Sequence, residues 1–196
     1  MNRRACLCFG VALLAAMTVV SCRTAELGFK VFDISGMIYD FSNRPIAHCE
    51  VSLSRNLKSS TDINGRFTLH KVPPGKYILT GIKKGFEYYS EEVTIKDAGQ
   101  IIYVRMPSQY QLLNLVDESL SANDFTSAEE FAGRAYQIDK SNLEMLFYYA
   151  TVKFRQNELV KAIDFLKEAG SLGSKDIYVE KFLNALKEMQ NADEQE

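Results

Sequence analysis

Residues 61–67 have the sequence Thr-Asp-Ile-Asn-Gly-Arg-Phe, and this stretch decides how the first half of the chain folds. Its middle, from Asp62 to Gly65, has the composition of a tight turn, because Asn and Gly tolerate the positive φ angles that hairpins need. After the turn, Phe67 and Leu69 alternate with polar residues, which is the two-residue period of a strand with one buried face. The stretch therefore predicts a β-hairpin.

The same two-residue period recurs on both sides of this turn. Other turn residues divide the alternating runs, at Asn43-Arg44-Pro45, Pro73-Pro74-Gly75 and Lys84-Gly85. Short alternating runs with a turn about every 8–12 residues are typical of an all-β sandwich. The side chains that we expect to point inward are Ile34, Gly36, Ile38, Ala47, Cys49, Val51, Leu53, Phe67, Leu69, Tyr77, Leu79, Val93, Ile95, Ile102 and Val104.

Several motifs in this half resemble the carboxypeptidase regulatory-like domain. They are residues 34–40, 45–47, 51–53, 61–67 and 72–77, and Gly85-Phe86 stands where that family often has Gly-Tyr. The resemblance implies a seven-stranded, prealbumin-like antiparallel sandwich over residues 29–107. It implies no peptidase activity, because this domain is the non-catalytic appendage of those enzymes.

One loop of the predicted sandwich is a candidate binding site, because it is rich in aromatic residues. Phe86, Tyr88 and Tyr89 lie close together in it, and exposed rings can stack on sugars or anchor a partner protein. The alternative is that one or two of these rings cap the sandwich. The chain has no Trp, which counts against a carbohydrate platform.

We predict no metal site and no cofactor. Asp62 and Asn64 faintly resemble a calcium loop, but the other oxygen ligands of such a loop are missing. His48 and His70 are the only histidines and form no zinc-binding pair, so we expect them on the surface of strands. Cys49 is expected to be a buried thiol.

After residue 107 the apolar period changes to that of a helix, and the pattern repeats after 34 residues. Five pairs of residues at this spacing keep their chemical type: Asp124 and Glu158, Phe125 and Leu159, Ala128 and Ala162, Ala135 and Ala169, and Ile138 and Leu172. The period resembles that of tetratricopeptide helix hairpins. Lys140 stands where the family favours Pro, and a generic helical bundle is the alternative.

The resemblance divides the helical domain, residues 108–189, into two repeats near 109–142 and 143–176 and a capping helix. Residues 190–196 are expected to form a disordered tail. The first helix of each repeat would line a concave face that binds an extended peptide, although the helices can equally form a spacer or a dimerisation bundle. The side chains expected on this face are Tyr110, Asn114, Asp117, Glu144, Tyr148, Thr151 and Arg155.

The N-terminus has the pattern of a lipoprotein signal. Residues 1–21 combine a basic start with an apolar run that is too short to span a bilayer. The run ends at Ser21-Cys22, which resembles the bacterial lipobox and implies diacylglycerol on Cys22, a cut before it and a lipidated linker over residues 22–28. Arg23 after this cysteine favours the outer membrane. An ordinary cleaved signal with a coincidental cysteine is the alternative.

Cysteine count and charge fit this location. Cys6 and Cys8 would leave with the signal, so Cys49 has no partner for an internal disulfide. The chain has 196 residues and a formal net charge of −2, which gives no electrostatic reason to expect a nucleic-acid partner. Residues 23–107 carry +3 (12 basic, 9 acidic) and residues 108–196 carry −7 (9 basic, 16 acidic). The acidic half favours basic or neutral protein partners.

These patterns predict an α+β chain in two segregated domains, a seven-stranded antiparallel β-sandwich followed by a tetratricopeptide-like stack of antiparallel helical hairpins. Catalysis is not predicted, because the adjacent acidic pairs Glu91-Glu92 and Glu129-Glu130 diverge on strand or helix. We expect a lipid-anchored, non-enzymatic interaction or scaffold protein of the bacterial envelope. Its partners would be other envelope proteins or peptides, and glycan or peptidoglycan binding is the alternative.

Overall fold

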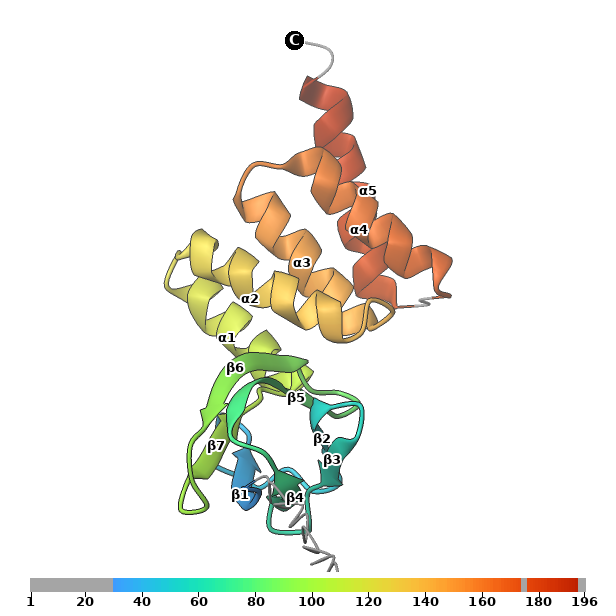
Figure 1. The fold of residues 1–196 in the computed structure, drawn as a ribbon. Coiled ribbons are helices and arrows are strands. Elements are labelled where there is room, and N and C mark those ends of the chain that lie inside the picture. Colours follow the sequence, from blue (N-terminus) through green and yellow to red (C-terminus); the bar gives the residue numbers. More distant parts are fainter. Residues whose placement is uncertain (1–29, 174–175, 194–196) are drawn as a thin grey trace, which may run out of the picture.

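A computed structural model describes residues 30–173 and 176–193 of the chain (Figure 1). Within these residues, seven strands come first and five helices follow, which confirms the predicted α+β class with segregated domains. The helices stack on one end of the sandwich (Figure 1). The predicted signal peptide, Cys22 and the linker 22–28 lie outside the described residues.

The strands form a sandwich of two sheets. One sheet has the order β4-β1-β7 and the other β3-β2-β5-β6. The bounds are β1 (Phe32–Tyr39), β2 (Glu50–Ser54), β3 (Leu57–Ser60), β4 (Arg66–Val72), β5 (Gly75–Ile82), β6 (Tyr89–Ile95) and β7 (Ile101–Arg105). β5 begins at the predicted Pro-Pro-Gly turn and ends just before Lys84.

The sequence predicted a sandwich in which all strand pairs are antiparallel, but one pair of strands in the structure is parallel. β7 pairs with β1 in parallel, with Gly36 opposite Ile102. A parallel pair needs a crossover connection in place of a hairpin. Strands β2 to β6 supply this crossover, since the chain leaves the four-stranded sheet after β6 and enters the other sheet in the direction of β1.

The turn at Asp62 to Gly65 forms, but it does not close a hairpin. The Gly65 N–H donates to the Asp62 carbonyl over 3.0 Å, whereas the strands on either side, β3 and β4, belong to different sheets. Thr61 donates its N–H to Cys49, and Gly65 accepts the N–H of Ile38, so the two ends of the turn are held by opposite sheets. The predicted hairpin was therefore wrong, although the predicted turn is correct.

The interior of the sandwich contains most of the side chains that the alternation predicts. Ile34, Ile38, Val51, Leu69 and Leu79 are fully buried, and Tyr77 and Val93 pack against them partly exposed. Met106 also lies in this core although the alternation did not include it. The core explains why two sheets of short strands stay together.

The helices repeat the 34-residue period of the sequence. Their bounds are α1 (Gln109–Ser121), α2 (Phe125–Ile138), α3 (Leu143–Arg155), α4 (Leu159–Ser171) and α5 (Ile177–Asp193). The starts of α3 and α4 follow those of α1 and α2 by 34 residues. The turn between α1 and α2 repeats between α3 and α4, because Asn123 and Asn157 have positive φ angles, of 57° and 62° respectively.

Small side chains lie where the helices cross. Ala128, Ala135, Ala162 and Ala169 have no exposed surface, as expected for positions at which two helices approach closely. Larger side chains, among them Leu112, Leu146 and Leu166, fill the space around them. This alternation of small and large side chains produces close packing.

Helix α5 is longer than the predicted capping helix. It continues to Asp193 and so includes four residues that we had expected in the disordered tail. It begins 34 residues after α3, at the position where a third repeat would begin its first helix. Among the described residues, no helix has the length and apolar character needed to cross a membrane.

Candidate functional site

The candidate site is the face made by the first helices of the repeats, α1, α3 and α5, which we call the A-helix face. Tyr110 on α1 is 65% exposed and Tyr178 on α5 is 71% exposed. Glu144 on α3 occupies the repeat position between them, since these three residues are 34 apart. The helical period thus places one residue of each helix at an equivalent point of the face.

Four of the seven residues predicted for this face lie near one another. Burial raises the pKa of Tyr148, and the charges of Asp117 and Glu144, together with Tyr110, raise it further. These four side chains therefore share one electrostatic environment across α1 and α3. The environment is acidic and aromatic, which suits a cationic ligand.

The other three predicted residues have different surroundings. Arg155 donates to Asn123 over 2.7 Å and lies over the ring of Phe125, so it holds the end of α3 to the turn between α1 and α2. The Thr151 hydroxyl donates to a carbonyl of its own helix. Asn114 is exposed beside the loop that follows β1, where it lines a hollow with Phe41.

A cavity of about 470 Å³ opens between α3 and α5, and we call it the α3–α5 cavity. Its lining consists of Leu143, Glu144, Phe147, Asp176, Tyr178 and Val179. Its wall continues into packed aromatic rings, because Phe147 lies 5.7 Å from the ring of Phe182, which in turn contacts Phe154 at 5.7 Å. The cavity therefore has a firm, mostly apolar wall.

Sequence reasoning missed the contribution of α5 to this face. It assigned this helix to capping, so Tyr178 was not a candidate. The signal was present in the sequence, since adding 34 to the position of Glu144 gives Tyr178.

The aromatic loop of the sandwich does not form an exposed platform. Phe86 and Tyr89 are partly buried against the sandwich core, and only Tyr88 among the three is exposed, at 58%. Burial and a hydrogen bond from its hydroxyl to Glu91 raise the pKa of Tyr89 to about 12. Two of the three rings thus belong to the core, as in the alternative that we considered.

This loop instead joins the sandwich to the helices. Glu87 accepts two hydrogen bonds from the guanidinium of Arg134 on α2, each over 2.8 Å. The N–H of Gln109 donates to Gly85, and the N–H of Glu87 donates to Pro107. A bidentate pair of this kind fixes orientation as well as distance.

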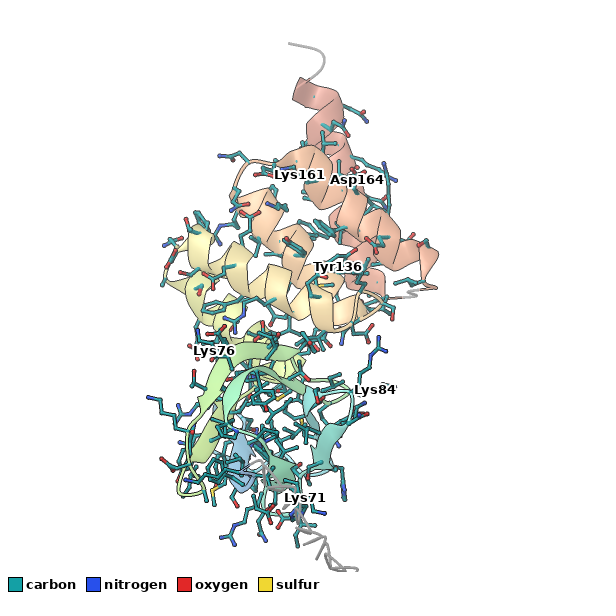
Figure 2. The ribbon with its side chains drawn as sticks, viewed as in Figure 1. Lys71, Lys76, Lys84, Tyr136, Lys161 and Asp164 are labelled. Atoms are coloured by element: carbon teal, nitrogen blue, oxygen red, sulfur yellow. The ribbon has the colours of Figure 1, made fainter. Side chains whose placement is uncertain are left out.

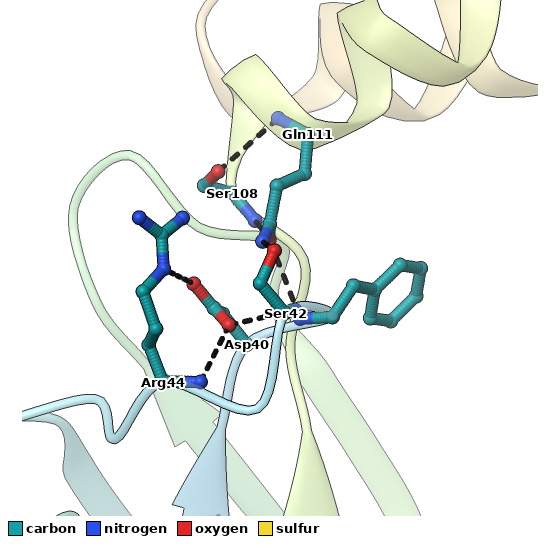
Figure 3. A network of polar contacts seen from close by, with 6 residues as sticks. Asp40, Ser42, Arg44, Ser108 and Gln111 are labelled. Carbon is teal, nitrogen blue, oxygen red and sulfur yellow. Dashed lines mark hydrogen bonds and ion pairs between the residues drawn. The ribbon is translucent and has the colours of Figure 1, made fainter. Parts of the chain in front are cut away.

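A second set of contacts completes the joint between the two domains (Figure 3). Ser108 and Gln111 form a capping box at the start of α1. The Gln111 side chain also donates to the hydroxyl of Ser42 over 2.9 Å and accepts the N–H of Phe41. Helix α1 is therefore tied to the loop after β1 from its first turn.

Asp40 holds that loop in shape (Figure 3). Its carboxylate accepts the N–H groups of Ser42 and Arg44 and the Nε of Arg44, all within 2.9 Å. Burial works to raise the pKa of Asp40, but these hydrogen bonds outweigh it and lower the pKa. The loop is thus ordered by one nearly buried carboxylate.

Within the helices, Lys153 is an almost fully buried charge. It bonds Glu129 of α2 and Gln156, and it also pairs with Glu158. Burial works to lower the pKa of Lys153, whereas the hydrogen bond and charge of Glu129 and the charge of Glu158 raise it, and the net shift is upward. The cluster joins α2 to α3, so its role is structural.

The adjacent acidic pairs diverge, as predicted. Glu129 binds Lys153 while Glu130 faces Arg134. On β6, Glu91 accepts the Tyr89 hydroxyl and Glu92 pairs with Lys76. The two carboxylates of each pair therefore contact different partners.

No group of three His, Cys, Asp or Glu side chains in residues 30–173 and 176–193 is arranged to hold a metal ion. His70 is exposed on β4 beside Asp33, as predicted. His48 is exposed too, but it lies in a turn with a positive φ angle of 52°, whereas we had expected a strand. Cys49 is buried, and burial raises the pKa of its thiol, which makes it unreactive.

Comparison with known families identifies the first domain. Residues 33–104 match the model of the carboxypeptidase regulatory-like domain. This region of the chain is therefore a carboxypeptidase regulatory-like domain. The match confirms the resemblance that the sequence motifs indicated. No curated protein matches the chain.

Solved structures resemble parts of the fold at low identity. A chain of a type II cohesin–X-dockerin complex from Acetivibrio cellulolyticus is 20% identical, with a TM-score of 0.35 over 40% of this chain and 58% of that one. The first TPR of Spaghetti (RPAP3), bound to an HSP90 peptide, is 13% identical, with a TM-score of 0.41 over 43% and 67%. The D312A variant of BcpA, the major pilin subunit of Bacillus cereus, is 16% identical, with a TM-score of 0.33 over 40% and 29%.

Proposed function

We propose that this chain is a lipid-anchored protein of the bacterial envelope that acts as a non-enzymatic protein-interaction module. The observation that carries this proposal is the A-helix face, where the exposed Tyr110 and Tyr178 accompany acidic side chains and an apolar cavity. Tyrosine is one of the residue types enriched among the few residues that contribute most of the free energy of binding at protein interfaces.

The sandwich serves as a spacer in this proposal. β1 runs from Phe32 toward the helices, because Ser42, soon after its end, contacts Gln111 of α1. The tether would therefore enter the sandwich at the end opposite the helical stack. With a rise of about 3.3 Å per residue along β1, the A-helix face would stand more than one strand length away from the membrane.

The support for the lipid anchor comes from the sequence. The apolar run that ends at Ser21-Cys22 supports lipidation of Cys22, and two or more acyl chains give lasting membrane attachment. Arg23 in the position after this cysteine favours the outer membrane. An interaction module on such an anchor would act on other envelope proteins or on peptides within reach of the membrane.

Several observations support a role without catalysis. The acidic pairs diverge, the thiol of Cys49 is buried, and the buried Lys153 is bound by Glu129 and Glu158. No acid, base and nucleophile converge in the described residues on a site where a substrate could react. The matched regulatory-like domain is also the non-catalytic part of the enzymes that carry it.

Membrane attachment can be tested with Cys22→Ser. We expect the wild-type chain to enter the detergent phase of a phase-separating detergent extract, with the mass of acyl chains on its N-terminal peptide. The Cys22→Ser variant should lack that mass. A variant that still carries the acyl mass would contradict the lipid anchor at this residue.

The glycan alternative can be tested on purified peptidoglycan. We expect the full chain to stay in the supernatant when peptidoglycan is sedimented. Sedimentation of the wild type but not of Tyr88→Ala would favour the glycan function over the one proposed here. Tyr110→Ala is the matched control, since it removes an exposed tyrosine from the helical domain.

A further inference from the structure

We propose that the α3–α5 cavity binds a segment of a partner protein in which large apolar side chains are flanked by Lys or Arg. The inference rests on the proposed function, because it specifies the kind of partner segment that the A-helix face binds. It goes further by assigning the apolar contact to one cavity and the charge preference to named carboxylates.

The walls of the cavity favour an apolar side chain. Leu143 and Phe147 line it from α3, and Tyr178 and Val179 line it from α5. Leu143 is 37% exposed and Tyr178 is 71% exposed, so both can bury more surface when a ligand binds. The volume of about 470 Å³ lies in the range that binding pockets occupy, about 300–1,000 Å³.

The rim of the cavity favours positive charge on either side of that apolar side chain. Glu144 and Asp176 both line it. Asp117 adds a further negative charge near Glu144, since the charges of both residues raise the pKa of Tyr148. The helical domain as a whole carries the acidic excess of the chain. These carboxylates would repel the negative charges of an acidic segment. The cavity therefore discriminates against acidic segments and also attracts basic ones.

The helix N-termini beside the cavity do not reverse this preference. The first N–H groups of a helix attract anions when they are free. Here the side chain of Asn142 accepts the N–H of Met145 at the start of α3, and Asp176 accepts the N–H of Tyr178 at the start of α5. At the start of each of these two helices, one of the first N–H groups is thus already bound by a side chain of the protein.

The test is a selection of peptides from a random library displayed on phage, with the full chain in detergent as the immobilised target. Enriched peptides are then synthesised with blocked ends and a fluorescent label. We expect them to contain one or two large apolar residues with Lys or Arg on both sides. Their affinity should fall about tenfold or more, or about 1.4 kcal/mol, in Tyr178→Ala and in Glu144→Lys.

Matched controls keep the result specific. Tyr88→Ala removes another exposed tyrosine, from the sandwich, and Asp164→Lys reverses another exposed charge, on α4 (Figure 2). Both should bind the selected peptides like the wild type. All four substituted side chains are exposed, and a circular dichroism spectrum like that of the wild type confirms that each variant folds.

Three results would overturn the inference. The first is a library that yields no basic and apolar peptides. The second is selected peptides whose affinity depends on Tyr110 but not on Tyr178 or Glu144, which would leave the proposed function standing and refute the cavity as its site. The third is concentration-dependent self-association that Tyr178→Ala abolishes, because a second copy of the chain would then be the occupant.

Discussion

Gly36 lies at the centre of β1, between β4 and β7, and it leaves room for the ring of Phe67. A Cβ at this position would collide with that ring and come within 2.7 Å of the Ile102 carbonyl oxygen. The two-residue period of the sequence placed Gly36 on the inward face, but it gave no sign of the ring above it. Which neighbour fills a gap depends on how the two sheets pack, and a single strand does not contain that information.

Gly36→Ala should lower the free energy of unfolding by about 1–3 kcal/mol, because the new methyl group overpacks the core. Urea denaturation followed by circular dichroism measures the change. Gly170→Ala is the matched control, since a Cβ there meets nothing within 4 Å and Ala favours a helix. Equal losses in both variants would mean that the ring of Phe67 is not the cause.

Asp40 gives a prediction of pH dependence. Its hydrogen bonds with Arg44 and Ser42 lower its pKa below the ordinary 3.8. Because the pKa of Asp40 is lower in the folded chain, its ionised carboxylate stabilises the fold fully at pH values above the ordinary pKa of 3.8. This stabilisation is lost as the pH falls from there through the lower pKa of the folded state. Asp40→Asn should therefore cost about 1–2 kcal/mol at pH 7 and clearly less at pH 3.

The control for this measurement is Asp97→Asn, which changes an exposed carboxyl group in the turn between β6 and β7. Urea midpoints at the two pH values, each compared with the wild type, give the result. A loss for Asp40→Asn that is the same at pH 3 and pH 7 would contradict the role of its charge.

At the scale of elements, the helices were easier to predict than the strands. A helix makes its hydrogen bonds within itself, so local sequence signals were enough to place α1 to α4. These signals are the apolar period and the turn and cap residues Asn123, Asp124 and Asn142. β3 was missed because its sequence, Leu-Lys-Ser-Ser, has little apolar alternation. The parallel pairing of β1 and β7 was missed because it depends on a crossover through five other strands.

The close crossing of α3 and α4 depends on small residues, which gives a prediction for these elements. Ala162→Leu should destabilise the helical domain by about 1–3 kcal/mol, because Ala162 has no exposed surface and the larger side chain would push the helices apart. Ala185→Leu on α5 adds the same atoms at an exposed position and should change the thermal midpoint little. If Ala162→Leu were as stable as the wild type, the helices would not be closely packed there.

At the scale of the whole molecule, the joint between the domains sets the direction of the A-helix face. Arg134 holds Glu87 on one side, and Gln111 holds Ser42 and Phe41 on the other. Two sets of contacts on different loops restrain rotation better than one, since a single contact leaves an axis free. The sequence suggested two separate domains and gave no sign that they are joined in this way.

Residual dipolar couplings measured by NMR test this joint. We expect one alignment tensor to fit both domains of the wild-type chain. The double variant Glu87→Ala, Gln111→Ala should need two, because the side-chain contacts that hold the joint on both sides are lost. Glu92→Ala removes an exposed ion pair with Lys76 away from the joint and should behave like the wild type, whereas two tensors already in the wild type would contradict a fixed joint.

The central claim is that the A-helix face is where this chain meets its protein partner. The most direct measurement is photo-crosslinking in living cells, with a photoreactive amino acid placed at Tyr110, Tyr178 or Tyr88 in turn. The account predicts that Tyr110 and Tyr178 crosslink to a distinct envelope protein and that Tyr88, on the sandwich, does not. Crosslinks from Tyr88 alone, with none from either position of the A-helix face, would contradict it.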